Sequence, residues 1–387
     1  MKSLRRILIV LVPTVATLAV SVEPVTGRSI PPDVRAQQAL TKTLARFVKL
    51  PGAPPGVIAL IQRGRQIAVK TAGVARVGGG PPTAHDHMRL ASTTKAFNGA
   101  VALALVSRGV LGLNDTIGKR LPYLPRAWRA VTLRDALAHR SGLPNFTDNP
   151  RYLAAIQASP AHGPSPRGLL SYVANQPLDF APGSKYHYSN SDNVVVGLMV
   201  EAATGRSYQS ELRRLVLRPL GLSQTSLPTT LAMPRPYMHG YHVQPGVAPE
   251  DISTVISPSW TWAAGGMVST PADLNRFARA YIAGRLFSAG VRRQQRQTRK
   301  GDSEPPGPGA NFAGLAVFRY RTSCGTVYGH TGNFPGYTQF FASTRNGQRS
   351  VVVSTNEQLR PGVNSRVFDA LRKADALAVC AALAGSG

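Results

Sequence analysis

A serine and a lysine stand three positions apart at the start of an expected helix. Ser92 and Lys95 open the segment STTKAFNGAVALALVSR (92–108), which Gly109 ends. Residues i and i+3 share a helical face, so the hydroxyl and the amine would lie side by side. A helix N-terminus favours an anionic oxygen, and a lysine among apolar residues has a lowered pKa. Ser92 is therefore a candidate nucleophile and Lys95 its candidate base, the alternative being an ordinary N-cap serine beside a solvated lysine.

A second group, Tyr188-Ser189-Asn190, lies in a predicted loop just before a helix expected to start at Asn193. A phenol near a lysine can lose its proton below its usual pKa of about 10. Tyr188 could then act as general base in acylation and as general acid to the leaving group. Asn190 could bridge Lys95 and a substrate amide. A buried tyrosine followed by a turn asparagine is the alternative.

A third group, His330-Thr331-Gly332, is expected near the end of a strand. A glycine here would let a substrate backbone lie beside the strand as an added one. Thr331 offers a hydroxyl to a substrate carboxylate, and His330 offers a proton donor or a positive charge. A plain strand end is the alternative.

In this order the three groups resemble the penicillin-recognising serine hydrolases, which include class C β-lactamases, D-alanyl-D-alanine carboxypeptidases and related esterases. The resemblance covers about residues 35–384, and the exported carboxypeptidases look most similar. The further matching stretches are VTLRDALAHRSGL (131–143), PGSKYHYSN (182–190), AAGGMVSTPADLNRF (263–277) and GHTGNFPGYTQFFAS (329–343).

The resemblance implies roles for single residues. Ser92 would be the nucleophile, and Lys95 and Tyr188 would share proton transfer, with the acylation base left open between them. An oxyanion hole would form from the backbone N–H groups of Ser92 and Asn333. The residues implied to bind substrate are Asn190, His330, Thr331, Gly332, Asn333 and Trp260, the last as an aromatic bordering the cleft.

Two positions depart from the carboxypeptidases that the sequence resembles. Asn333 stands where they usually have a threonine, and Phe318 stands where they place an arginine for the substrate carboxylate. Arg319 and Arg321 lie close by, but strand alternation points them to the opposite face from Phe318. These departures put recognition of a terminal D-Ala carboxylate in doubt and favour an esterase somewhat.

The elements that must position these groups alternate between β and α patterns. A helix is expected over residues 31–50, a hairpin over 57–70, several helices between 110 and 260, and a helix over 271–283. Strands are expected over 315–320, 327–331, 338–343 and 350–354, followed by a helix over 364–383. The pattern predicts an α+β fold of the β-lactamase/transpeptidase type, in which both chain ends build one antiparallel sheet. The catalytic domain would span 31–387, with an α/β lobe (about 31–90 and 260–387) and a helical lobe (about 91–259).

The charge is strongly basic, with 45 Lys and Arg against 18 Asp and Glu and a net charge of +27. We find no zinc finger, RNP-type strand or basic zipper, so nucleic acid is not an expected partner. A basic surface fits association with anionic cell-wall polymers. Few carboxylates and only two cysteines argue against a metal centre, and no cofactor is expected. A monomer is expected.

The N-terminus indicates export. Lys2, Arg5 and Arg6 precede an apolar stretch (7–20), which is the pattern of a signal peptide over 1–27, cut after Ser21 or Gly27. An uncleaved anchor is the alternative. An exported chain can keep a disulfide, and Cys324 and Cys380 are either paired or two free thiols. The resemblance favours the pair. The protein would then be secreted or periplasmic, without a transmembrane span after cleavage.

Together these features predict an exported serine hydrolase that acts through an acyl-enzyme on Ser92. The expected substrate is the D-Ala-D-Ala peptide of cell-wall precursors, and a β-lactam would acylate the same serine. An esterase or a class C β-lactamase on the same scaffold is the alternative within this class. The alternative outside it is a catalytically silent sensor of wall fragments or penicillin.

Overall fold

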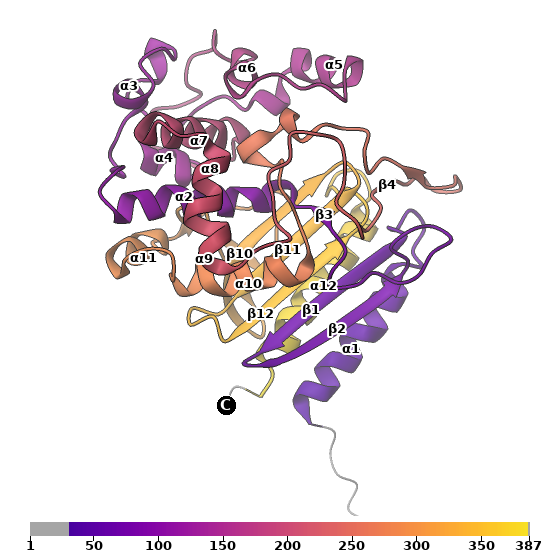
Figure 1. Ribbon diagram of the computed structural model, residues 1–387. Helices are drawn as coiled ribbons and strands as arrows, with labels where there is room; N and C mark the ends of the chain where they lie inside the picture. Colours follow the sequence, from indigo (N-terminus) through magenta and orange to yellow (C-terminus); the bar gives the residue numbers. More distant parts are fainter. Residues whose placement is uncertain (1–30, 386–387) are drawn as a thin grey trace, which may run out of the picture. The chain divides into compact units, whose positions relative to one another are not determined.

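The computed structural model describes residues 31–385, and from Pro32 onward the chain forms one compact unit. One large sheet dominates this unit (Figure 1). Its strands are β1 (Gly56–Arg63), β2 (Gln66–Gly73), β7 (Arg299–Lys300), β8 (Ala310–Ala313), β9 (Phe318–Thr322), β10 (Gly325–Phe334), β11 (Tyr337–Ser343) and β12 (Arg349–Thr355). Their order is β2-β1-β12-β11-β10-β9-β8-β7, and every neighbouring pair is antiparallel. The first hairpin therefore closes against the last strand of the chain.

Alternate residues of each buried strand point to opposite sides of the sheet, so the sheet has two apolar faces. Helices cover both of them. Phe340 and Val353 join the core beneath α1 (Pro32–Phe47) and α12 (Ser365–Leu383). Their neighbours Phe341 and Val352 join the larger core on the other face. That second face carries α2 (Thr94–Ser107), α10 (Pro271–Ala283) and α11 (Ala289–Gln295) (Figure 1).

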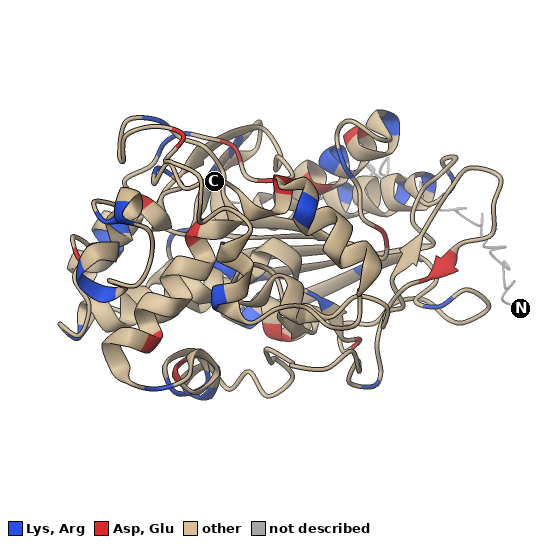
Figure 2. Cartoon of the chain, turned by 90° about the horizontal axis from the view of Figure 1, so that it is seen from above, with Lys and Arg blue, Asp and Glu red and all other residues tan. Residues whose placement is uncertain are grey.

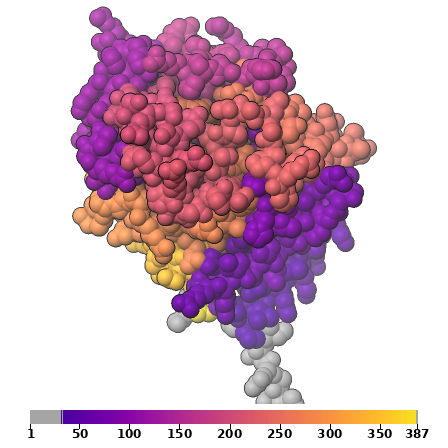
Figure 3. Space-filling view, viewed as in Figure 1, coloured from indigo at the N-terminus to yellow at the C-terminus, as the bar shows by residue number. Residues whose placement is uncertain are grey.

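The middle of the chain supplies mostly helices, with α2 and α7 at their centre. They are α3 (Ile117–Arg120), α4 (Leu133–Leu137), α5 (Pro150–Ala158), α6 (Pro166–Ser171), α7 (Asn190–Thr204), α8 (Tyr208–Leu212), the π-helical turn Arg213–Leu217 and α9 (Arg218–Leu220). Two short antiparallel pairs lie outside the large sheet: β3 (Met88–Arg89) with β6 (Val268–Ser269), and β4 (Tyr241–His242) with β5 (Glu250–Asp251). In the space-filling view the indigo first strands adjoin the orange and yellow last elements, below the magenta middle segments (Figure 3).

The predicted α+β class with one antiparallel sheet is confirmed. Some boundaries were wrong. The helix after Tyr188 begins at Asn190, because Ser189 is extended and ends the preceding segment. Strand β9 begins at Phe318, not Leu315, because residues 315–317 are buried in a turn in which Ala316 has a φ of 52°. These residues are apolar because they pack against other elements, and their backbone does not have strand geometry.

The predicted disulfide between Cys324 and Cys380 is present and ties the turn between β9 and β10 to α12. The predicted signal sequence, residues 1–27, lies outside the described residues, and the proposed lobe limits stay predictions. Within residues 31–385, none of the helices combines the length and the apolar character needed to cross a bilayer.

Candidate active site

Ser92 lies in a strained turn immediately before α2. It belongs to a 3-10 turn, Ala91–Thr93, and Ala91 adopts a left-handed φ of 52° although it is not glycine. Such a backbone costs free energy and persists only where the surrounding structure enforces it. The Thr93 hydroxyl helps by donating to the Leu90 carbonyl at 2.7 Å. Ser92 is only half-buried whereas its neighbours are buried, so the turn presents this hydroxyl outward.

The Lys95 amine is fully buried beneath Ser92 and has three polar neighbours. Lys95 Nζ lies 3.0 Å from Ser92 Oγ, 2.6 Å from Asn190 Oδ1 and 2.8 Å from the Ala264 carbonyl oxygen. Burial is the main cause that lowers the Lys95 pKa from 10.5 to about 7, because the charged ammonium loses its hydration. At neutral pH a large fraction of Lys95 is therefore an uncharged amine.

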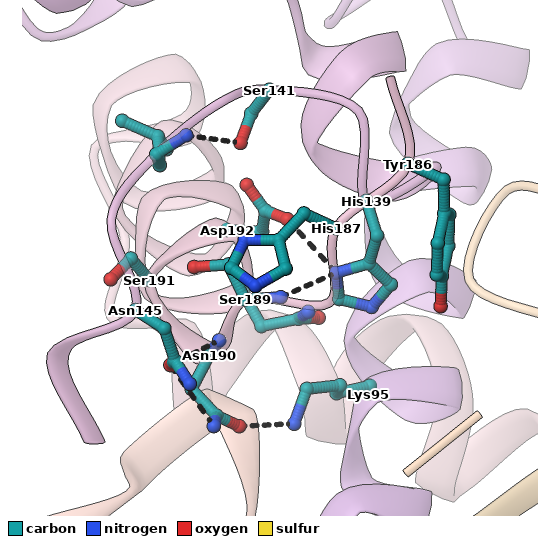
Figure 4. Close-up of polar contacts among 12 residues, drawn as sticks. Lys95, His139, Ser141, Asn145, Tyr186, His187, Ser189, Asn190, Ser191 and Asp192 are labelled. Carbon is teal, nitrogen blue, oxygen red and sulfur yellow. Dashed lines mark hydrogen bonds and ion pairs between the residues drawn. The ribbon is translucent and has the colours of Figure 1, made fainter. Parts of the chain in front are cut away.

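The three neighbours suit both protonation states of Lys95. Asn190 Oδ1 and the Ala264 carbonyl can only accept hydrogen bonds, so they occupy both protons of a neutral amine. The remaining lone pair then faces the Ser92 hydroxyl, whose proton it can take. Asn190 is held in the required orientation, since its Nδ2 donates to Asn145 Oδ1 at 3.2 Å (Figure 4). The same nitrogen donates to Thr147 Oγ1 at 3.0 Å.

Tyr188 covers this pair from the other side. Lys95 Nζ lies 4.9 Å from the centroid of its ring. Its side chain is 3% exposed, and its hydroxyl has no hydrogen-bond partner among the described residues. Burial raises the Tyr188 pKa well above 10, while the nearby Ser92 side chain lowers it by less. The phenol is therefore protonated at rest and is more suited to donating than to accepting a proton.

A buried histidine and aspartate that sequence reasoning missed support Tyr188 from behind. The His139 ring stacks on the Tyr188 ring with centroids 4.3 Å apart. His139 Nδ1 lies 2.9 Å from Asp192 Oδ2, and the Ser189 N–H donates to the same nitrogen at 3.3 Å (Figure 4). Burial lowers the pKa of His139 and raises that of Asp192, which favours a neutral pair sharing one proton. His139 also has a left-handed φ of 54°, a second strained position beside the site.

These two residues carried weak signals in the sequence. His139 follows a short helix and Asp192 lies in the first turn of α7, where a carboxylate is expected for its effect on the helix dipole. Neither pattern indicates that the two side chains meet. His139 lies in one of the stretches that carried the resemblance, and that stretch was the only hint available.

Strand β10 brings the third group to Ser92 through Gly332. A Cβ at Gly332 would lie 2.6 Å from the Ser92 nitrogen, so only glycine allows this approach. Strand β9 pairs with residues 325–329 alone, and beyond Gly329 that side of β10 has no strand partner within the described part of the chain. The motif lies near the end of β10, as predicted, and the strand continues two residues beyond it to Phe334.

The side chains of this motif are mostly engaged elsewhere. The Thr331 hydroxyl donates to the Pro305 carbonyl at 2.6 Å, and Asn333 Nδ2 donates to the Leu359 carbonyl at 3.1 Å. His330 is fully buried against Phe318, with ring centroids 5.0 Å apart, and burial lowers its pKa to about 3. His330 is therefore neutral, and its Nε2 has no partner in the described residues. The predicted substrate contacts of these residues stay predictions.

Trp260 lies apart from the other candidates. Its indole N–H donates to the carbonyls of Ser159 and Pro160, and its ring packs on Tyr152. It stands four residues before Ala264, whose carbonyl contacts Lys95. Its predicted place at the border of the cleft stays a prediction.

An open cavity of about 380 Å³ adjoins Tyr188. The loop of residues 301–309 forms one wall and carries Asp302 and Glu304, both exposed. Elsewhere Lys and Arg are spread over many helices and loops (Figure 2). Within residues 31–385 no group of three or more His, Cys, Asp or Glu side chains is arranged to hold a metal ion. The cavity is lined by Tyr186, His187, Tyr188, Lys300, Gly301, Asp302 and Glu304.

Comparisons with known proteins identify the family and the fold. A family model described as Beta-lactamase matches residues 40–376. Penicillin-binding protein 4* of Bacillus subtilis (strain 168) is 24% identical over 294 residues, which are 72% of this chain and 62% of that protein. The chain thus spans less than two thirds of this relative's own length.

Two solved structures extend the comparison. A D-stereospecific amidohydrolase from Streptomyces sp. has a TM-score of 0.75 and 30% identity, covering 86% of this chain and 97% of that one. A D-amino acid amidase from Ochrobactrum anthropi SV3 has a TM-score of 0.74 and 24% identity, covering 88% and 99%, and shows a shared fold.

Proposed function

The chain belongs to the β-lactamase family of serine hydrolases, as its motifs predicted, and we propose that it is an amidohydrolase acting through an acyl-enzyme on Ser92. The observation that carries this proposal is the buried Lys95 amine. It lies 3.0 Å from Ser92 Oγ, and its pKa is lowered to about 7. A general base near the operating pH at hydrogen-bond distance from a hydroxyl is what nucleophilic catalysis requires.

The acylation step follows from these contacts. Ser92 Oγ attacks the substrate carbonyl carbon while the Ser92 proton passes to neutral Lys95, and the carbonyl electrons move onto oxygen. When the intermediate collapses, the C–N bond breaks and the leaving nitrogen takes a proton from the Tyr188 phenol or from Lys95. Tyr188, held protonated by burial, suits the donor role, and Lys95 suits the role of acylation base. Water then attacks the ester at Ser92 and releases the acid.

The carbonyl oxygen needs donors as it becomes negative. The N–H groups of Ser92 and Asn333 are the proposed pair, and the close approach of Gly332 to the Ser92 nitrogen supports it. A single donor of this kind typically contributes about 3 kcal/mol to lowering the barrier. The helix α2 that follows Ser92 adds a favourable dipole.

The proposed substrates are amides of D-configured amino acids. This assignment rests on the similarity to the Streptomyces protein described as a D-stereospecific amidohydrolase, which this chain matches over nearly its full length. Hydrolysis of a D-Ala-D-Ala peptide, the expectation from sequence, is one member of this class. It is less supported, because Phe318 occupies the position of the carboxylate-binding arginine and the Thr331 hydroxyl is bonded to Pro305.

Acylation by a β-lactam is a second candidate activity. Penicillin-binding protein 4* is a relative by sequence, and the same Ser92–Lys95 pair would open the lactam ring. Export by the basic and apolar N-terminus, with a cell-wall setting for the basic surface, remains part of the proposal.

The test is covalent labelling combined with turnover. A fluorescent penicillin should label the wild type and Ser171→Ala, an exposed serine on α6, but not Ser92→Ala. D-alanine p-nitroanilide should be hydrolysed faster than its L enantiomer and faster than D-Ala-D-Ala peptides. Turnover of p-nitrophenyl acetate without any amide would favour the esterase, and a stable adduct without turnover would favour the sensor. Equal labelling of Ser92→Ala contradicts the proposal.

A further inference from the structure

The open cavity is lined by Tyr188 of the candidate active site and by two carboxylates, Asp302 and Glu304. Tyr188 lines this space of about 380 Å³, is 3% exposed, and has no hydrogen-bond partner for its hydroxyl within residues 31–385. A buried hydroxyl without a partner loses free energy that an incoming polar ligand can restore. The Tyr188 ring also lies over Lys95, with Nζ 4.9 Å from its centroid, so the cavity borders the Ser92–Lys95 pair through Tyr188.

The loop carrying Asp302 and Glu304 is held in place on this cavity. Tyr186 donates its hydroxyl to the Asp302 carbonyl, and Thr331 donates to the Pro305 carbonyl. Between them Ser303 is buried and lies 3.1 Å, through its Oγ, from the Tyr320 hydroxyl. The backbone of the loop is thus held at Asp302 and at Pro305, on both sides of Glu304. The second of these bonds comes from Thr331 of the third motif.

Groups that could hold a substrate carboxylate are lacking at this end of β10. Position 318 is a phenylalanine, the Thr331 hydroxyl is used by the loop, and His330 is neutral and buried. The titratable groups with ordinary charges that remain on the cavity wall are the two carboxylates and Lys300, beside the imidazole of His187, whose Nδ1 lies 3.7 Å from Asp179 Oδ2. An anion would meet a net negative wall, whereas a cation would be attracted.

We propose that this cavity binds an ammonium group of the substrate, with Glu304 as its principal ligand and Asp302 as a second carboxylate. The proposal rests on the proposed amidohydrolase function and specifies its substrate class. The recognised substrate group would be a cation, whereas in a carboxypeptidase it is the terminal carboxylate, an anion. In a chain with a net charge of +27, two acids on the wall of one cavity are a local exception.

The charge of Glu304 extends to the catalytic centre. Desolvation raises its pKa, while Lys95 lowers it and Asp148 raises it further. Conversely, Glu304 raises the pKa of Lys95 against the larger effect of burial. A bound ammonium would neutralise Glu304, and Lys95 would lose part of the charge that favours its protonated form. Binding the cation would thus favour the neutral base.

The ammonium could come from two parts of a substrate. It could be the free α-amine of a D-aminoacyl amide, or a side-chain amine further along an N-acylated peptide. Two substrate pairs distinguish them: D-alanine p-nitroanilide against its N-acetyl form, and Nα-acetyl-L-lysyl-D-alanyl-D-alanine against its Nα,Nε-diacetyl form. At pH 7 both kinds of amine are largely protonated.

The experiment measures kcat/KM for both pairs with the full chain. The wild type should prefer the ammonium form of at least one pair by about tenfold, mainly through KM. Glu304→Gln should remove most of that preference, measured as the ratio of kcat/KM between the two forms within the same variant. Glu304→Lys should favour the acetylated form. Glu250→Gln, an exposed acid on β5, is the matched control and should behave like the wild type.

The outcomes separate the two proposals. Turnover with no preference for an ammonium, or a preference that Glu304→Gln and Glu304→Lys both retain, overturns the cavity assignment and leaves the amidohydrolase proposal intact. A lack of both turnover and Ser92 labelling overturns both. Thermal melting of each variant identifies a folding defect, and the acetylated substrate serves as the internal measure of active enzyme.

Discussion

The two sides of the site differ in how far their titratable groups are exposed. On the helical side, Lys95 is buried and bonded to Asn190 and to the Ala264 carbonyl, and the buried His139 and Asp192 are bonded to each other. On the strand side, the acids of the 301–309 loop are exposed and line an open cavity. Within the described residues, polar atoms without a partner occur on both sides, at Tyr188 Oη and Asp192 Oδ1 on the first and at His330 Nε2 on the second, but the exposed charges belong to the second.

This difference indicates that the helical side carries out proton transfer and the strand side binds the substrate. Proton transfer needs fixed geometry and shifted pKa values, and burial supplies both on the helical side. Recognition needs accessible charges that a ligand can neutralise, and the loop on the strand side supplies those. Variants of buried residues should therefore lower kcat, and variants of the open wall should act mainly on KM.

The largest effect is expected for Lys95→Ala. Removing the base should slow acylation of Ser92 by roughly 10²–10⁴-fold, because the serine proton loses its acceptor. The measurement is the rate of labelling by a fluorescent penicillin under single-turnover conditions. Lys42→Ala, an exposed lysine on α1, is the control and should label normally. Normal labelling of Lys95→Ala would assign the base to Tyr188.

The pH dependence should follow the lowered pKa of Lys95. The amine must be neutral to accept a proton, so acylation should rise about tenfold per pH unit below pH 7 and level off above it. The rate of penicillin labelling between pH 5 and 9 checks this. If the labelling rate instead keeps rising through pH 9, as expected for a pKa near 10, Lys95 is charged at neutral pH. Lys95 would then not be a neutral base before substrate binds.

An intermediate effect is expected at the His139–Asp192 pair. His139→Asn should lower kcat roughly 10- to 100-fold, because Tyr188 loses the ring that stacks against it and fixes its position. KM should change little, and the upper limb of the pH profile should move if Tyr188 donates the proton. A wild-type kcat with only a lower melting temperature would make His139 a structural residue alone.

The smallest effect is expected for Thr331→Val, which keeps the side-chain shape and removes the hydroxyl that holds the 301–309 loop. The loss of one hydrogen bond to the Pro305 carbonyl should raise KM a few-fold for ammonium substrates and leave kcat nearly unchanged. Steady-state kinetics on D-alanine p-nitroanilide checks this. A large fall in kcat would place Thr331 in the catalytic step.

Local patterns in the sequence were enough for most elements. The hairpin around Gly64, the helix after Ser92 and the helix capped by Thr270 follow from alternation, periodicity and capping residues, and they appear within a few residues of their predicted limits. The exceptions were segments such as residues 315–317. This run is apolar because distant elements bury it, and it does not form a strand.

The sequence by itself determined that a hydroxyl and an amine share one turn of a helix, because that spacing is a property of the local backbone. It also determined the family, because three motifs in one order are specific. Only the tertiary structure decided that Lys95 is buried enough to be neutral, that His139 stacks on Tyr188, and that the Thr331 hydroxyl is bonded to a loop. Burial and contacts between segments far apart in the chain depend on packing, which no local pattern encodes.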